Sequence, residues 1–475
     1  MPSLYQPEIL FAADSPYTNQ GLLVDDSGTV IGVAAEQSVP TGTRRISMPG
    51  KALLPGLANA HSHTFQRLFR ARAEGRRDGG DTFWTWREQM YRAAEFVSPD
   101  DLFHVARATF LEMLHAGITV VGEFHYLHRD AKGEAYSDSN LLSHQVIAAA
   151  QSVGIRISLL RTAYFRAGFG KTPHPGQRRF YEQPDTYLRN LDDLVSAYAN
   201  AENVTVGAAP HSIRAVPLDE LKQIAEYART HGNLPLHMHI SEQVGENAAC
   251  FEEYGATPVS LVAAHGILSP RTTLIHAIHL TEAELAAVAE YKATICSCPT
   301  TERNLGDGIF PADAAACLGI PVAFGTDSQA QIDILEDARQ LEYHLRLKDQ
   351  QRGILDASAR SDWASREPIG NALFRAASSN GYAALGLPGG SLAAGEPADF
   401  FTVDLNDLSI LGSDAESILT QAVFASAKGA IRDVAVQGRL VLQDGKHVLN
   451  EDIRTQYQDV QRRYQATAPS RQGDL

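Results

Sequence analysis

The amino-acid sequence predicts an α/β fold: a (β/α)8 barrel of the TIM type, with a small β-sandwich domain built from both chain ends. Eight short apolar runs in the middle of the chain alternate with longer helical patterns, as expected for parallel strands joined by helices. Polar residues, above all histidines, lie at the carboxyl ends of these runs. Because a (β/α)8 barrel builds its active site at that face, both patterns support the same fold.

The two ends of the chain carry a different pattern, which predicts the small domain. Residues 20–34 favour two short strands joined by a turn. Similar alternating, turn-punctuated segments return at residues 398–405, 432–440 and 441–448. We expect one β-sandwich made from residues 1–52 and 397–450. The polar residues 451–475 are expected to form a surface helix that frays at its end.

Residues 53–396 are expected to form the barrel. Helical periodicity is clear between several of the apolar runs, for example in residues 100–116 and 218–231. The eight runs that predict the strands are residues 51–61, 117–125, 155–165, 204–212, 234–242, 273–280, 293–301 and 321–328.

Composition excludes several classes of function. The chain has 475 residues and a formal net charge of -15, which argues against a general nucleic-acid binder, although a few arginines can still make one pocket positive. No apolar run reaches about 18 residues, so we expect no membrane span. The N-terminal segment lacks the pattern of a secretory signal, and the four cysteines form no CxxC pair. We therefore expect a cytoplasmic protein with reduced thiols.

The sequence HSH at residues 61–63 ends the first apolar run. Alternate residues of a strand point to the same side, so His61 and His63 can face the barrel mouth together. Two neutral imidazoles are half of a zinc site, and His239 in the fifth run and Asp327 in the eighth add a nitrogen and a carboxylate. Such a set leaves one coordination position for water, which is typical of catalytic zinc.

HxH after the first run, HxxE at residues 239–242, His276 after the sixth run and Asp327 after the eighth together resemble the amidohydrolase superfamily. The segments SLAAGEPADFFTVD and VAVQGRLVLQDGK are similar to its closing segments, and the fourth run lacks a lysine, as in its mononuclear deaminase branch. The resemblance implies one Zn²⁺ per chain, with the ligands His61, His63, His239 and Asp327. It also implies that Glu242, His276 and Asp327 are catalytic and handle protons or polarise the substrate.

Further motifs, among them HSHTFQR, FWTWREQMYR, PHSIRAV and ERNLGDGIFP, resemble the formimidoylglutamate deiminase family within this branch. The resemblance implies hydrolytic deamination of N-formimino-L-glutamate to N-formyl-L-glutamate and ammonia, in histidine degradation. The partner would be a small-molecule dicarboxylate, and we also expect a homodimer. The residues implied to hold the glutamate part of the substrate are Gln66, Arg87, Tyr126, His211 and Arg214.

Two segments depart from this resemblance. Gln329 stands where some relatives have a histidine, and the segment CPTTERN at residues 298–304 is unusually polar. We expect both at the rim of the pocket, where they would affect the choice of substrate more than the reaction.

Other interpretations stay open. A related deaminase would act on a purine, a triazine or another amidine-like compound, but such a pocket needs flat aromatic walls, whereas paired arginines suit two carboxylates. A barrel that has lost its activity is the alternative from another class, and a zinc assay separates the two. Among single residues, His279 competes with His276, His237 is expected to be a hydrogen-bonded core residue, and Arg87 could be a surface arginine.

Overall fold

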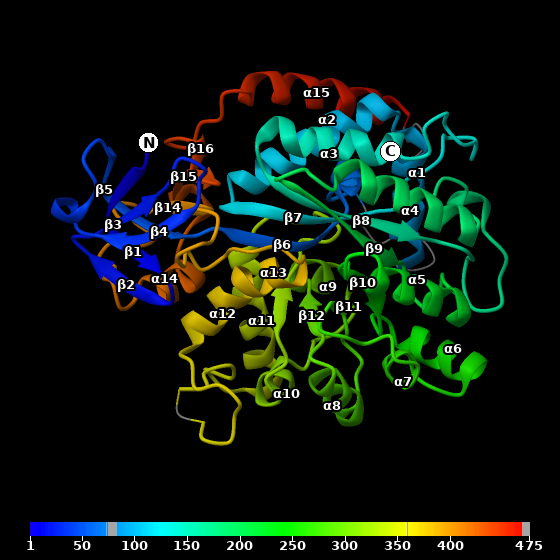
Figure 1. Cartoon of the computed structure of the whole chain (residues 1–475). Helices are drawn as coiled ribbons and strands as arrows, with labels where there is room; N and C mark the ends of the chain where they lie inside the picture. The colour runs from blue at the N-terminus through cyan, green and yellow to red at the C-terminus, as the bar shows by residue number, and fades with distance from the viewer. Residues whose placement is uncertain (73, 75–82, 359, 468–475) are drawn as a thin grey trace, which may run out of the picture.

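The computed structural model describes residues 1–72, 74, 83–358 and 360–467 (Figure 1). One sheet has eight parallel strands, each beside the next one along the chain. An isolated parallel bridge between Ser62 and Asp327 joins the two outermost strands, so the sheet nearly closes on itself. The predicted (β/α)8 barrel is therefore confirmed. Its strands are β6 (Leu57–Ser62), β7 (Ile118–His125), β8 (Arg156–Ala163), β9 (Val204–Pro210), β10 (Leu236–Ile240), β11 (Thr272–His276), β12 (Thr294–Ser297) and β13 (Val322–Phe324).

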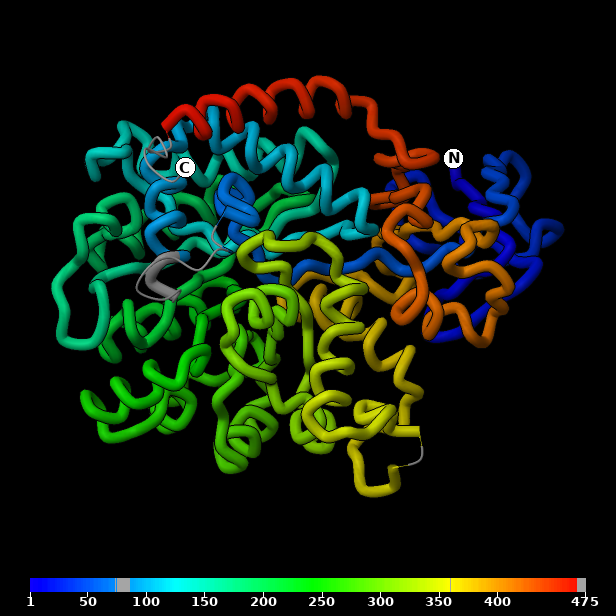
Figure 2. The backbone as a smooth tube through the Cα atoms, turned by 180° about the vertical axis from the view of Figure 1, so that it is seen from behind, coloured from blue at the N-terminus to red at the C-terminus, as the bar shows by residue number. Residues whose placement is uncertain are grey.

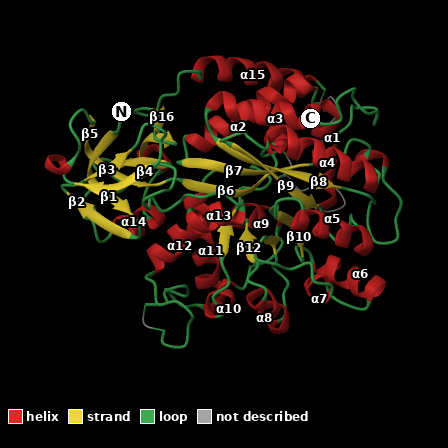
Figure 3. Cartoon of the chain, viewed as in Figure 1, coloured by secondary structure: helices red, strands yellow, loops and turns green. Residues whose placement is uncertain are grey.

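Helices surround this sheet on the outside (Figure 3). Helix α2 shows how the sequence starts one: Ser98 and Asp101 form a reciprocal capping box, and Pro99 occupies the first turn. The barrel helices are α1 (Phe83–Phe96), α2 (Pro99–Leu114), α3 (Leu141–Val153), α4 (Pro184–Tyr198), α5 (Leu218–Thr230), α6 (Val244–Tyr254), α7 (Pro258–Ala264), α8 (Glu282–Glu290), α9 (Pro299–Leu305), α10 (Ala312–Cys317), α11 (Ile334–Asp349), α12 (Ile369–Ala377) and α13 (Ser379–Ala384). Short 3-10 turns add η2 (Thr64–Phe69) and η3 (Pro175–Gln177).

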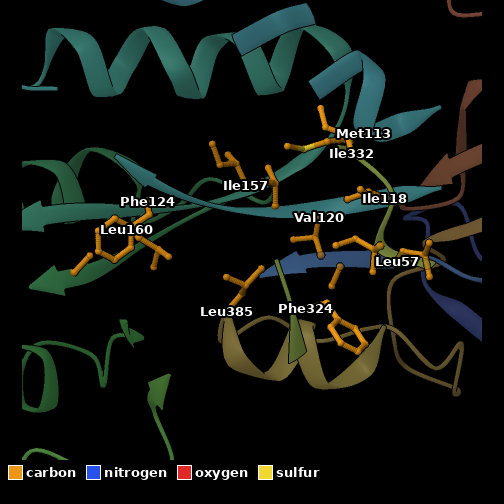
Figure 4. Close-up of a cluster of buried hydrophobic side chains, with 14 of the residues drawn as sticks. Leu57, Met113, Ile118, Val120, Phe124, Ile157, Leu160, Phe324, Ile332 and Leu385 are labelled. Carbon is orange, nitrogen blue, oxygen red and sulfur yellow. The ribbon is translucent and has the colours of Figure 1, made fainter. Parts of the chain in front are cut away.

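The barrel strands are almost entirely buried, and only Thr205 in β9 and Val322 in β13 are partly exposed. Every residue of β7 and β8 is buried, as expected for parallel strands that are covered on both faces. Figure 4 shows part of this core, with side chains such as Leu57, Val120 and Ile157 from neighbouring strands. Leu385, which follows α13, packs so closely on β7 that a Cβ at Gly122 would lie 2.4 Å from its Cδ2. The tight interior fixes the strand ends that carry the polar residues.

Both chain ends together build the predicted small β-domain, whose strands are hydrogen-bonded into one mixed sheet in the order β16-β15-β14-β5-β1-β3-β4, with β2 paired to β1. In Figure 2 the orange C-terminal strands lie against the blue N-terminal ones. The strands are β1 (Ser3–Ala12), β2 (Ser15–Thr18), β3 (Gly21–Val24), β4 (Val30–Ala34), β5 (Arg44–Pro55), β14 (Phe400–Asp404), β15 (Ile431–Val436) and β16 (Arg439–Leu442). The remaining elements are η1 (Glu36–Ser38), α14 (Ile418–Phe424) and η4 (Lys428–Ala430).

The apolar run at residues 51–61, which the sequence predicts as one strand, is in fact two. Strand β5 belongs to the small sheet and ends at Pro55, and β6 of the barrel begins at Leu57. Gly56 makes the junction, because a Cβ there would lie 2.2 Å from Oγ1 of Thr119. The chain therefore passes from one sheet to the other within a single apolar run, which conceals the change.

The C-terminal segment forms helix α15 (Asn450–Ala466), which crosses α2 along one side of the barrel (Figure 1). Arg463 pairs with Asp101 at 2.6 Å, and Arg107 pairs with Asp452 at 3.0 Å. The predicted fraying end, residues 468–475, lies outside the described residues. Among the helices of the described chain, none is both long and apolar enough to cross a membrane.

Candidate metal centre and active site

Four side chains meet at the carboxyl ends of three barrel strands. His61 lies near the end of β6, His63 follows it, His239 lies on β10, and Asp327 follows β13. One nitrogen or oxygen atom from each lies within 4.8 Å of the others, and all four residues are buried. Oδ1 of Asp327 is 3.3 Å from Nε2 of both His61 and His63. The structure thus brings together the four ligands that the sequence predicts.

Hydrogen bonds at the histidine rings leave nitrogens available for a metal. Nδ1 of His63 lies 2.8 Å from the carbonyl oxygen of Phe124, and Nδ1 of His239 lies 3.0 Å from that of His211. A ring that donates from Nδ1 keeps the Nε2 lone pair for a metal ion. Within the described chain, both buried ring nitrogens of His61 lack a hydrogen-bond partner. Since buried polar atoms are normally satisfied, a metal ion at this ring explains the arrangement.

The charges of the four residues also suit a divalent cation. Burial lowers the pKa of His61 to about 3 and lowers the pKa values of His63 and His239, so these imidazoles are neutral at pH 7. Burial alone would raise the pKa of Asp327, but the neighbouring histidines hold it below its ordinary value. Three neutral imidazoles and one carboxylate form a ligand set of the catalytic zinc type.

The closure of the barrel fixes Asp327. Its backbone N–H donates to the carbonyl of His61, and the N–H of His63 donates to the carbonyl of Asp327, both at 3.0 Å. Asp327 has a φ of +45° and His276 a φ of +68°, values that side chains with a Cβ rarely adopt. Such strain costs on the order of 1–3 kcal/mol per residue and concentrates at functional sites.

Two further predicted residues lie beside the four ligands. Nε2 of His276 is 3.9 Å from Oε1 of Glu242 and 3.7 Å from Oδ2 of Asp327, and its Nδ1 is 3.3 Å from Oε1 of Glu302. Burial opposes a charge on His276, but the three carboxylates raise its pKa well above the ordinary value. His279 instead donates to the carbonyl of Asp307 at 2.9 Å, so His276 is the histidine that faces the cluster.

A pocket opens next to this cluster. All five residues that were expected to bind the substrate line it: Gln66, Arg87, Tyr126, His211 and Arg214. Nε2 of Gln66 donates to Oη of Tyr126 at 2.7 Å, and the ring of His211 stacks on His239 with centroids 4.7 Å apart. The structure therefore places the predicted substrate residues around one cavity that also contains the candidate ligands His63, His239 and Asp327.

The two arginines give this pocket positive charge. Arg214 is partly exposed, and its guanidinium makes no hydrogen bond or ion pair with any residue that the structure describes. Burial opposes its charge, yet the nearby carboxylates of Glu246 and Glu242 raise its pKa. Nε of Arg87 donates to Oη of Tyr91 at 2.6 Å, which orients the guanidinium. A free guanidinium and an oriented one can each bind a carboxylate.

Sequence reasoning missed several residues of the pocket. Tyr164, at the end of β8, accepts a hydrogen bond from Gln177 at 2.8 Å, and its place at a strand end was a signal that could have found it. Trp86, Met90 and Leu305 belong to the motifs FWTWREQMYR and ERNLGDGIFP, but the resemblance assigned a role only to Arg87 among these residues. The missed lining residues are Trp86, Met90, Tyr164, Phe180 and Leu305.

The expectation that Gln329 and residues 298–304 lie at the rim is wrong for most of these side chains. Gln329 and Thr301 are fully buried, and Glu302 in the same helix α9 as Thr301 is 3% exposed. Polar residues there serve buried hydrogen bonds: Glu302 accepts from the backbone N–H of Cys298 at 2.7 Å and contacts His276. His237, in contrast, has the expected core role, with Nε2 2.9 Å from the carbonyl of Ala384.

Comparison with known proteins places the whole arrangement in one family. The amidohydrolase family profile matches residues 52–441, which include all the site residues described above. The chain belongs to the amidohydrolase family.

Two curated relatives come from Pseudomonas aeruginosa. A formimidoylglutamate deiminase is 39% identical over 422 residues, which cover 88% of this chain and 91% of the relative. An 8-oxoguanine deaminase is 27% identical over 415 residues, covering 86% of each. Among solved structures, an amidohydrolase from Brucella melitensis superposes with a TM-score of 0.88 at 32% identity, covering 98% of this chain and 100% of that one.

For an amidohydrolase the site has the necessary parts for hydrolysis of a carbon–nitrogen bond. The buried cluster of His61, His63, His239 and Asp327 suits a divalent metal. Glu242 and His276 lie next to it and can move protons. The adjoining cavity contains two arginines, Arg87 and Arg214.

Proposed function

We propose that the protein is a zinc-dependent hydrolase that converts N-formimino-L-glutamate and water to N-formyl-L-glutamate and ammonia. The observation that carries the proposal is the pocket itself, in which the guanidinium groups of Arg87 and Arg214 share a cavity with three of the four candidate metal ligands, His63, His239 and Asp327. The 39% identical formimidoylglutamate deiminase supports the same substrate. A substrate with two carboxylates needs such concentrated positive charge, because the protein as a whole is acidic.

One zinc ion would be held by nitrogens of His61, His63 and His239 and by the carboxylate of Asp327. When bound, zinc polarises water and lowers its pKa to about 7. The chain lacks a lysine in β9, the fourth barrel strand, which could bridge to a second metal ion. We therefore propose one ion per chain.

The side chains around the ligands account for the proton transfers. Asp327 accepts a proton from the attacking water as the new carbon–oxygen bond forms at the formimino carbon. Glu242 delivers a proton to the substrate nitrogen, and His276, 3.9 Å from Glu242, stabilises the negative charge that develops on the tetrahedral intermediate. Asp327 then passes its proton to the amino nitrogen and Glu242 takes up the proton of the new hydroxyl group, so that the carbon–nitrogen bond breaks, ammonia leaves and both carboxyl groups return to their starting states. General acid–base catalysis of this kind contributes about 10²–10⁴-fold in rate.

The glutamate part of the substrate would occupy the far side of the pocket. Arg87 and Arg214 bind its carboxylates through charge-assisted hydrogen bonds. The amide of Gln66, held by Tyr126 at 2.7 Å, and the imidazole of His211 complete the polar wall. The two arginines come from α1 and from the segment after β9, so the spacing of two separate elements would determine which length of substrate fits.

A second candidate function rests on the aromatic lining. Tyr126, Tyr164 and Phe180 give the pocket flat walls, which would also suit a purine such as the substrate named for the 8-oxoguanine deaminase relative. The two functions differ in what the substrate offers to Arg87 and Arg214, because a neutral heterocycle has no carboxylate that could form a charge-assisted hydrogen bond with either guanidinium.

Ammonia release from a panel of compounds tests the proposal. Zinc-loaded protein should release ammonia from N-formimino-L-glutamate with the highest kcat/KM, more slowly from formiminoglycine, and not from 8-oxoguanine or adenosine. A heterocycle as the best substrate would support the second candidate and reject the first. Turnover that is unchanged after complete removal of metal would reject the zinc-dependent mechanism.

A further inference from the structure

Gln329 lies two residues after the candidate ligand Asp327 and is completely buried. Its side-chain amide forms hydrogen bonds through both its nitrogen and its oxygen. Nε2 donates to Oγ of Ser62 at 2.8 Å and to the carbonyl of Asp327 at 3.0 Å, and Oε1 accepts from Oγ1 of Thr326 at 2.9 Å. These partners belong to two segments, the end of β6 and the loop after β13, which meet where the barrel closes.

Ser62, the hydroxyl partner of Gln329, lies between His61 and His63. Its Oγ donates to Oε2 of the buried Glu123 at 2.7 Å. The other oxygen of Glu123 accepts from the backbone N–H and from Oγ1 of Thr64, both at 2.8 Å. Ser62 and Thr64, which alternate with the two histidines along the chain, are therefore held by hydrogen bonds on the side opposite the metal cluster.

We infer that Gln329 is a positioning residue for the metal centre: its amide ties the strand that carries His61 and His63 to the loop that carries Asp327. The inference rests on the metal site of the proposed function but not on the identity of the substrate. Three of the four candidate ligands lie on the two segments that this amide joins. A loss of the amide should let these ligands separate, and groups that orient metal ligands typically contribute about 10–100-fold to metal affinity.

The chemistry of the amide explains why this residue type is suited to the position. Only a side chain with both donors and an acceptor can donate to Ser62 and to the Asp327 carbonyl while it accepts from Thr326. A carboxylate could not donate to either partner, and a thioether of similar size could donate to neither and accept only weakly from Thr326. Gln329 also has a φ of +60° and Asp327 a φ of +45°, so the loop is held in a conformation that its hydrogen bonds must stabilise.

A purely structural role for Gln329 would give a different result from a positioning role. If the amide only closes the barrel, its loss lowers the free energy of unfolding of the metal-free and of the metal-loaded protein by the same amount. If it positions the ligands, its loss also reduces the stabilisation that the metal adds, because that gain depends on the affinity of the folded state for the ion.

The test compares Gln329→Met and Gln329→Glu with the unmodified protein. The rate of zinc loss to an excess of chelator and the rise in melting temperature on zinc binding are measured for each. Thr402→Val is the matched control. Thr402 is fully buried in the small sheet, donates to Asp433 at 2.7 Å and accepts from its N–H at 3.0 Å, so its loss removes buried hydrogen bonds far from the cluster.

Both Gln329 variants should bind zinc about 10–100-fold more weakly and show a smaller zinc-induced rise in melting temperature, while Thr402→Val keeps the full rise. If either variant fails to fold, Ser62→Ala removes one acceptor of the same amide and should also weaken zinc binding. Zinc affinity within twofold of the unmodified protein in all folded variants overturns the inference. An unmodified protein that binds no zinc would instead overturn the metal site itself.

Discussion

The replacement Arg214→Met tests how the pocket recognises its substrate. Arg214 lines the cavity, and its guanidinium has no partner among the described residues, so its loss breaks no ion pair of the protein itself. The fold and the zinc content should remain unchanged. What disappears is a charge-assisted hydrogen bond to a substrate carboxylate, which contributes roughly 1.5–3 kcal/mol.

The expected loss follows from this energy. Since each 1.36 kcal/mol changes a rate or equilibrium constant tenfold, kcat/KM for N-formimino-L-glutamate should fall by about 10- to 150-fold. The lower part of the range applies if water replaces the guanidinium, because the side chain is only partly buried. Arg87 should show a similar loss on replacement with Met, although the change there also leaves Oη of Tyr91 without its donor.

Steady-state ammonia release is measured for N-formimino-L-glutamate and for formiminoglycine, which lacks the second carboxylate. At least one arginine variant should lose far more activity on the first compound. Arg303→Met, which removes an equal charge from the exposed surface of α9, is the control and should stay within about twofold. Equal losses on both compounds would show that the arginines shape the site generally, and no loss on either would refute the assigned carboxylate contacts.

Three further predictions concern catalysis, metal and pH. Glu242→Gln should keep its zinc but lose about 10²–10⁴-fold in kcat; loss of zinc together with activity would make Glu242 a ligand instead. Removal of zinc by a chelator should abolish activity and, for zinc held at about 100 times its Kd, reduce the free energy of unfolding by about 2.7 kcal/mol; an unchanged melting temperature would contradict a structural link between metal and fold. Burial would raise the pKa of Glu182, but His128 and Arg161 outweigh it and lower that pKa from 4.5 to about 2. The ionised Glu182 therefore stabilises the fold above pH 4.5, and this contribution disappears as the pH falls towards 2. The difference in unfolding free energy between the protein and Glu182→Gln, measured by urea denaturation, should be roughly 3 kcal/mol at pH 7 and should shrink by more than half at about pH 3.

The barrel was predictable from sequence because its strands are buried on both faces and so read as continuous apolar runs. The same property hid one boundary: the run at residues 51–61 remains apolar while the chain passes from β5 to β6, and only Gly56 marks the junction. In the small sheet, the turn-punctuated segment at residues 441–448 supplies the end of β16, which closes at Leu442, and then a turn with an isolated bridge between Gln443 and Lys446.

The candidate ligands were predictable because each stands at a strand end, where the spacing of residues determines the side to which a side chain points. Residues whose position depends on loops were not. Phe180 reaches the pocket from the segment after η3, and Leu305 from the end of α9, and no local pattern sets those paths. Gln329 was expected at the rim because it departs from the family resemblance, but its amide forms buried hydrogen bonds with Ser62 and Thr326.

The most direct test of the account measures both products from one reaction. Protein with a determined zinc content is incubated with N-formimino-L-glutamate, and ammonia and N-formyl-L-glutamate are quantified together. Ammonia and N-formyl-L-glutamate should form in equal amounts. Only protein that carries about one zinc ion per chain should form them. No N-formyl-L-glutamate from zinc-loaded protein, or equal turnover by protein stripped of metal, would contradict the account.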